Sequence, residues 1–98
     1  YIKVNKMSVI VRVPTPLRKI TNGADKIEVA SGTLQEIIES LNMKFPGIKE
    51  KLCDANGNLK SFVNIYINDE NIRVLNGINS IVLDNGEVSI VPAVAGGV

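Results

Sequence analysis

The stretch TLQEIIESLNMKF, residues 33–45, predicts the one long helix of this 98-residue chain. Thr33 is a typical N-cap residue, and Glu36 follows at the position from which a carboxylate bonds back to the backbone of the cap. Apolar side chains recur at helical spacing along one face, at Leu34, Ile37, Ile38, Leu41 and Phe45. Pro46-Gly47 ends the helix. An amphipathic helix must cover an apolar surface, so its flanking segments decide the kind of domain.

The segments before this helix are predicted strands. Ser8–Val13 is rich in β-branched residues and is followed by prolines, which cannot donate to a β-ladder. Lys26–Val29 alternates polar and apolar residues, as a strand with one face in water does. Because the turn signal Asn22-Gly23 lies between the two, we expect an antiparallel hairpin. Leu17 and Arg18, in the intervening loop, are expected to be exposed.

The segments after the helix predict further strands. We expect a short helical segment at Ile48–Cys53, a strand inside the sheet at Phe62–Ile67, a turn at Asn68–Asn71, a short strand at Ile72–Val74 and a last strand at Glu87–Val91. This order predicts an α+β domain in which a mixed sheet of about five strands carries one main helix on one face. The ubiquitin-like β-grasp, whose first and last strands lie side by side and parallel, is one of several arrangements with this order.

Composition limits the classes of function. The chain is long enough for one domain, and its net charge of +1 is spread over interspersed residues, so a nucleic acid is not an expected partner. Its apolar runs are too short to span a bilayer, so we expect no membrane association. Histidine is absent, which removes the commonest general base and metal ligand. We therefore expect a protein that is not itself an enzyme. We also expect it to be a monomer.

The only cysteine is expected to be structural. Cys53 cannot form an internal disulfide, and the chain carries no pattern of a secretory signal, which together favour the cytoplasm. It closes an apolar segment and has no histidine to activate it, so a buried, inert thiol is predicted. The carboxylates Asp54, Asp69, Glu70 and Asp84 lie in Asn- and Gly-rich turns, where local bonds to the backbone are favoured over a metal site.

The C-terminal tail, residues 93–98, contains the one reactive group that the sequence suggests. Ala93 to Gly97 are all small, and the diglycine Gly96-Gly97 lies one residue before Val98. Glycine has no Cβ, so such a segment fits channels too narrow for a side chain. We therefore divide the chain into an extension at 1–6, a domain at 7–92 and a flexible tail at 93–98. Residues 1–6 either precede a natural start at Met7 or extend the first strand through Ile2 and Val4.

Two segments resemble the ubiquitin-like sulfur carriers of prokaryotes. The first runs from Phe62 to Arg73 and contains the turn Asn68-Asp69-Glu70; the second runs from Asp84 to Gly97 and ends in Pro-Ala-Val-Ala-Gly-Gly. The similarity is nearest to the CysO type and extends more broadly to the ThiS and MoaD types. It includes the first strand and the loop after it, and so covers nearly the whole chain from Met7. The resemblance implies the ubiquitin-like β-grasp fold.

The resemblance also implies a function for the tail. The Gly97 carboxylate is adenylated with ATP by a ubiquitin-activating-type adenylyltransferase and converted to a thiocarboxylate, while Ala95 and Gly96 let the tail thread into the partner. In CysO-type systems the sulfur reaches an aminoacrylate on a synthase dependent on pyridoxal phosphate, and a zinc metallopeptidase releases cysteine. The implied chain is a cosubstrate that binds no cofactor itself; ATP, zinc and pyridoxal phosphate belong to its partners.

Val98 departs from the family pattern, which ends at the diglycine. We expect it to be a cap that a JAMM-type zinc metallopeptidase removes before activation; the alternative is a residue foreign to the natural protein. Other functions stay open at this point. The chain is either a sulfur carrier for cysteine, homocysteine, thiazole, molybdopterin or tRNA thiolation, or a ubiquitin-like modifier joined to lysines through Gly97, or a binding module that only shares the fold.

Overall fold

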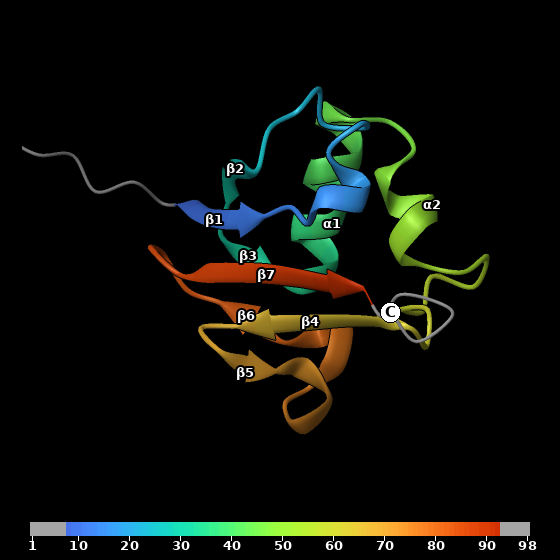
Figure 1. The fold of residues 1–98 in the computed structure, drawn as a ribbon. Helices are drawn as coiled ribbons and strands as arrows, with labels where there is room; N and C mark the ends of the chain where they lie inside the picture. Colours follow the sequence, from blue (N-terminus) through green and yellow to red (C-terminus); the bar gives the residue numbers. More distant parts are fainter. Residues whose placement is uncertain (1–7, 93–98) are drawn as a thin grey trace, which may run out of the picture.

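The computed structural model describes residues 8–92 of the chain (Figure 1). Its main sheet has five strands in the spatial order β2, β1, β7, β4, β5. In chain order they are β1 (Ser8–Arg12), β2 (Lys26–Ala30), β4 (Val63–Ile67), β5 (Glu70–Asn71) and β7 (Glu87–Pro92). The two α-helices are α1 (Leu34–Lys44) and α2 (Ile48–Leu52). No helix within residues 8–92 is long and apolar enough to cross a membrane.

The strand pairings confirm the predicted topology. β1 and β2 form the antiparallel hairpin, with Val9 opposite Val29. β7 lies parallel to β1 and antiparallel to β4, so the last strand occupies the middle of the sheet (Figure 1). This mixed sheet, with its first and last strands adjacent and parallel and a helix over one face, is the ubiquitin-like β-grasp.

One layer of apolar side chains joins the helices to the sheet. Strand residues alternate, so that Val9 and Val11 of β1 and Ile65 of β4 are buried while their neighbours face outward. The predicted stripe of α1 packs on them, with Leu34, Ile37, Ile38 and Leu41 no more than 2% exposed. Each such side chain contributes about 1.5–3 kcal/mol by leaving water, which makes this layer the main stabilising feature of the domain.

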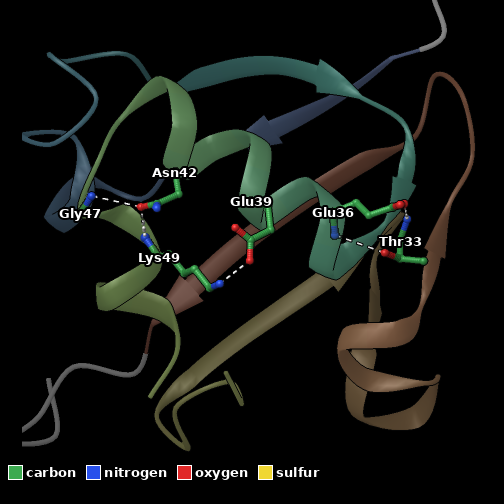
Figure 2. A network of polar contacts seen from close by, with 6 residues as sticks. All are labelled: Thr33, Glu36, Glu39, Asn42, Gly47 and Lys49. Atoms are coloured by element: carbon green, nitrogen blue, oxygen red, sulfur yellow. Dashed lines mark hydrogen bonds and ion pairs between the residues drawn. The ribbon is translucent and has the colours of Figure 1, made fainter. Parts of the chain in front are cut away.

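Hydrogen bonds at the ends of the helices define where each begins (Figure 2). The predicted capping box is formed at α1: Glu36 N–H donates to Thr33 Oγ1 at 3.2 Å, and Thr33 N–H donates to Glu36 Oε1 at 2.9 Å. At α2 the N-cap residue is Gly47, which has no side chain to accept a bond. Asn42 of α1 supplies the acceptor instead, because its Oδ1 accepts from Gly47 N at 3.1 Å and from Lys49 N at 3.2 Å.

The short strand predicted at Ile72–Val74 is wrong. These residues form a 3₁₀-helix, and the strand β5 lies just before them at Glu70–Asn71. Asn68 and Asp69 have φ of 49° and 73°, so they make a two-residue turn and place Glu70 opposite Ile67. Asn71 then caps the 3₁₀-helix by accepting from Arg73 N–H at 2.8 Å. The cap turns the chain, and Ile72 enters the core.

The exposure predicted for the first loop is also wrong. Leu17 is only 9% exposed and belongs to the core. Pro16 lies in the 3₁₀-helix Thr15–Leu17, and the fixed φ of proline favours such a turn, at whose end Leu17 packs inward. Arg18 is half-buried, and its Nε donates to the carbonyl of Val13 at 3.1 Å.

A second, small sheet was not predicted. β3 (Gly32–Thr33) pairs antiparallel with β6 (Ile81–Val82), so the segment before α1 meets the segment before β7. The carbonyl of Ser80 accepts the N–H of Leu34 at 2.8 Å, which satisfies a donor in the first turn of α1. The β6 segment thereby fixes the position of α1 beside the sheet.

Candidate functional site

The candidate site is the C-terminal tail, and the structure describes the point from which it starts. β7 ends at Pro92, which lies opposite Val63 of β4. The predicted reactive residue Gly97, the threading residues Ala95 and Gly96, and the predicted cap Val98 all lie outside the described residues. Their roles remain predictions. The predicted extension at residues 1–6 also lies outside them.

The tail follows the central strand of the sheet. β7 pairs with β4 over five residue pairs, Val63–Ile67 against Val88–Pro92, and with β1 over three, Ile10–Arg12 against Glu87–Ser89. A strand with a neighbour on both sides is held more firmly than an edge strand, since its backbone groups are paired in both directions. The tail therefore starts from a strand in the middle of the sheet. Residues 90–92 at the end of this strand have no partner in β1.

Two apolar side chains lie exposed beside the end of β7. Val91 is 46% exposed, and Phe62, just before β4, is 51% exposed. The Nζ of Lys60 lies 5.9 Å from the centre of the Phe62 ring, within the range of a cation–π contact. Among the apolar residues of β4 and the segments on either side of it, Phe62 and Leu75 are exposed, whereas Ile65 and Ile67 belong to the core.

Cys53 has the buried setting that the sequence predicted. Its side chain is 4% exposed, and burial raises the pKa of the thiol, with the Lys49 ammonium opposing that effect. Lys49 itself forms an ion pair with Glu39 across the two helices (Figure 2), and this hydrogen bond raises the pKa of the ammonium. A cavity of about 420 Å³ lies beside Cys53, between α2 and the following loop. A thiol that resists ionisation is a poor nucleophile, so the cavity has no activated group from Cys53.

Two of the turn carboxylates, Asp54 and Asp84, make structural bonds. Asp54 Oδ1 accepts from the N–H groups of Asn56 at 2.9 Å and Asn58 at 3.1 Å, as predicted. Asp84 instead accepts from the hydroxyl of Ser31, which ties the turn before β7 to the end of β2. Between residues 8 and 92, no group of three or more His, Cys, Asp or Glu side chains is arranged to hold a metal ion.

One residue near the base of the tail was missed in the sequence. Arg73 donates from Nη2 to the carbonyls of Ser61 at 3.2 Å and Val63 at 3.1 Å, and Val63 is the residue that lies opposite Pro92. No periodic pattern reports such a contact, because it joins a side chain to carbonyls ten and twelve residues earlier. In the sequence, this contact is indicated only by the position of a charged residue after a short hairpin.

Known proteins with similar sequences and structures match nearly the whole chain. The ThiS family model matches residues 11–97. The sulfur carrier protein CysO of Mycobacterium tuberculosis is 42% identical over 93 residues, which cover 93% of this chain and all of that protein. The crystal structure of the BexX/CysO complex of Amycolatopsis orientalis contains a chain with 39% identity and a TM-score of 0.86, with 91% of this chain and 99% of that one covered.

A further solved relative is named as a modifier. The solution structure of small archaeal modifier protein 1 from Methanosarcina acetivorans has a TM-score of 0.80 and 27% identity, and the match covers 97% of this chain and all of that one. The family match includes both glycines of the diglycine and ends one residue before Val98. The described fold, the tail sequence and these matches agree, and the chain belongs to the ThiS family of ubiquitin-like proteins.

Proposed function

We propose that this chain is a cytoplasmic sulfur carrier whose working group is the carboxylate of Gly97, freed by the removal of Val98. The observation that carries the proposal is the family match, which runs through the diglycine and stops at residue 97. The 42% identity to a sulfur carrier protein over its whole length supports the same role. Val98 is then a cap, since a carboxylate on valine puts a β-branched side chain at the reacting position.

The chemistry of the tail requires two partner-catalysed steps. An oxygen of the Gly97 carboxylate attacks the α-phosphorus of ATP, and pyrophosphate leaves. A hydrosulfide equivalent then attacks the acyl carbon, and AMP leaves with the electron pair of the broken C–O bond. The product is a thiocarboxylate on Gly97, a soft sulfur nucleophile. Glycine suits this position because a chain without Cβ atoms fits a narrow active-site channel.

The chain presents the Gly97 carboxylate, and partner enzymes catalyse the reactions at it. It has no histidine, and Cys53 is buried with a raised pKa, so the described residues offer no group that would activate the tail. We assign adenylation to a ubiquitin-activating-type adenylyltransferase and removal of Val98 to a JAMM-type zinc metallopeptidase. Sulfur transfer for cysteine takes place on a synthase dependent on pyridoxal phosphate. The carrier acts as a monomer in this scheme and is regenerated after each transfer.

A second candidate function is supported by one comparison. The match to small archaeal modifier protein 1 favours a modifier, in which the activated Gly97 is transferred to a lysine amine of another protein. The two functions share the tail and the activation step, so they differ only in the final acceptor. The higher identity to the sulfur carrier favours the first.

Intact-mass spectrometry separates these possibilities. The chain is incubated with the metallopeptidase, then with the adenylyltransferase, ATP and a sulfide source, in full-length form and as a matched form that ends at Gly97. We expect loss of valine from the full-length chain and exchange of one terminal oxygen for sulfur in both forms. A form ending at Ala95 is the negative control and should gain no sulfur.

Two outcomes would overturn the proposal. Full-length chain that gains sulfur while it retains Val98 would remove the role of the cap. Chain ending at Gly97 that stays a plain carboxylate, but appears as lysine-linked conjugates in its native host, would favour the modifier instead.

A further inference from the structure

The last residues of β7 have register partners in one neighbouring strand only. β1 reaches no further than Ser89 of β7, whereas β4 pairs with β7 as far as Pro92. Residues 90–92, which we call the tail root, lie opposite residues 63–65 of β4 and beyond the last residue of β7 that has a partner in β1. Any contact that steadies this part of β4 also steadies the tail root.

The other edge of β4 is left uncovered at the same place. β5 is two residues long and pairs only with Tyr66 and Ile67. Along an antiparallel strand, alternate residues direct their backbone groups to opposite neighbours. Asn68 N–H donates to Glu87 of β7 at 2.9 Å, so even-numbered residues of this strand face β7. The carbonyl of Val63 consequently faces the side where β5 is missing, and Ser61 lies in the turn just before β4.

The guanidinium of Arg73 occupies this uncovered edge. Its Nη2 donates to both carbonyls, at 3.2 Å for Ser61 and 3.1 Å for Val63, and its Nε lies 3.5 Å from Asn64 Oδ1. Such charge-assisted bonds are about twice as strong as neutral ones, and because Arg73 is exposed, water weakens them in part. They replace the donors that a longer β5 would have provided. Asn71 holds Arg73 in place by capping the 3₁₀-helix at its backbone N–H.

We propose that Arg73 is a positioning residue for the C-terminal tail. By holding the start of β4 and the turn at Ser61 just before it, Arg73 fixes the place and direction in which β7 ends, and so the point from which the tail reaches a partner enzyme. Its consequence for activation rests on the proposed function, while its effect on the tail root does not. A carboxylate that starts from a fixed root reaches an active site with less loss of orientational freedom than one on a frayed strand.

Amide hydrogen exchange tests the structural part. The variants are Arg73→Gln, which removes the charged guanidinium, and Arg73→Lys, which keeps a positive charge but loses the planar arrangement of N–H donors. Arg12→Gln is the matched control, because Arg12 lies on β1 and makes an exposed ion pair with Glu87 away from the tail root. We expect exchange at Asn64 and Val91, whose amides face each other across β4 and β7, to quicken about tenfold in Arg73→Gln, as the loss of one charge-assisted hydrogen bond predicts. The exchange rates of Arg73→Lys should lie between those of Arg73→Gln and the unsubstituted chain. Those of Arg12→Gln should match the unsubstituted chain at these residues.

Activation kinetics test the functional part. Each variant is prepared ending at Gly97 and given to an adenylyltransferase that activates the unsubstituted chain, with adenylate formation followed by pyrophosphate release. We expect Arg73→Gln to lower kcat about tenfold and to leave KM within about twofold, because the tail is less well directed while the rest of the surface is unchanged. A purely structural role would reduce the folded fraction and leave kcat of the folded protein unchanged.

Three results are decisive. Unchanged exchange at Asn64 and Val91 in Arg73→Gln overturns the inference, whatever the kinetics. Exchange that quickens evenly over the whole chain overturns it too, since Arg73 would then be a general stabilising residue. If the unsubstituted chain ending at Gly97 is never adenylated, the proposed function fails, and the exchange pattern still decides whether Arg73 holds the tail root.

Discussion

Replacing Asn42 with alanine tests how the two helices are joined. Asn42 Oδ1 accepts from the backbone N–H groups of Gly47 and Lys49, and no other side chain caps α2 (Figure 2). Each neutral hydrogen bond contributes about 1 kcal/mol, so two give about 2 kcal/mol. Water reaches the half-buried Lys49 and replaces part of this. We expect Asn42→Ala to lower the free energy of unfolding by about 1–2 kcal/mol.

Urea unfolding followed by circular dichroism measures this loss, and the same change lowers Tm by roughly 4–16 °C in a domain of this size. Asn42→Asp is the matched control, because it keeps the acceptor oxygen. The helix dipoles favour its negative charge at the first turn of α2 and disfavour it at the last turn of α1. We therefore expect the free energy of unfolding of Asn42→Asp to lie within about 0.5 kcal/mol of that of the unsubstituted chain. Equal stability of the alanine and unsubstituted proteins would refute the cap.

Three further predictions follow from single sites. A Cβ on residue 86 would lie 2.8 Å from Val82 Cγ1 and 2.9 Å from Leu83 O, so Gly86→Ala should lower the free energy of unfolding in urea by about 1–3 kcal/mol; an unchanged midpoint would contradict this close packing. Leu17→Ala should cost about 2–4 kcal/mol in the same assay, as for a core residue, and a loss near zero would restore the exposed loop predicted from the sequence. Burial raises the pKa of Cys53 in the folded protein, so its contribution to stability is complete below the pKa of the unfolded thiol and is lost as the pH rises through the folded value. Urea midpoints from neutral to alkaline pH should therefore fall less in Cys53→Ala, and parallel curves would count against a buried thiol.

Features set by neighbouring residues were predictable from the sequence. The capping box of Thr33 and Glu36 needs only residues three apart, and the stripe of α1 follows from helical periodicity. The turn chemistry of Asp54 was predictable for the same reason. The predicted strand at Ile72–Val74 failed because β-branched composition favoured a strand, while the cap at Asn71 and burial of Ile72 favoured a 3₁₀-helix. Local propensity is weak enough for one cap and one core contact to reverse it.

Contacts between distant segments were not predictable in this way. Asn42 gave no signal as the cap of α2, since its partners lie beyond the end of its own helix. The pairing of β3 with β6 joins segments about fifty residues apart, and neither segment is long enough to show a strand pattern. The burial of Leu17 likewise depends on the core beneath its loop.

The sequence by itself determined the helix, the central strands and the family, because these depend on local periodicity and on a run of residues ending in Gly96-Gly97. Only the tertiary structure decided what holds the start of that tail. β7 ends beyond the reach of β1 and rests on β4, and Arg73 completes the edge that β5 leaves uncovered. The physical reason is that unpaired backbone groups need partners wherever the folded chain exposes them, and which side chain is near enough is known only once the strands have met.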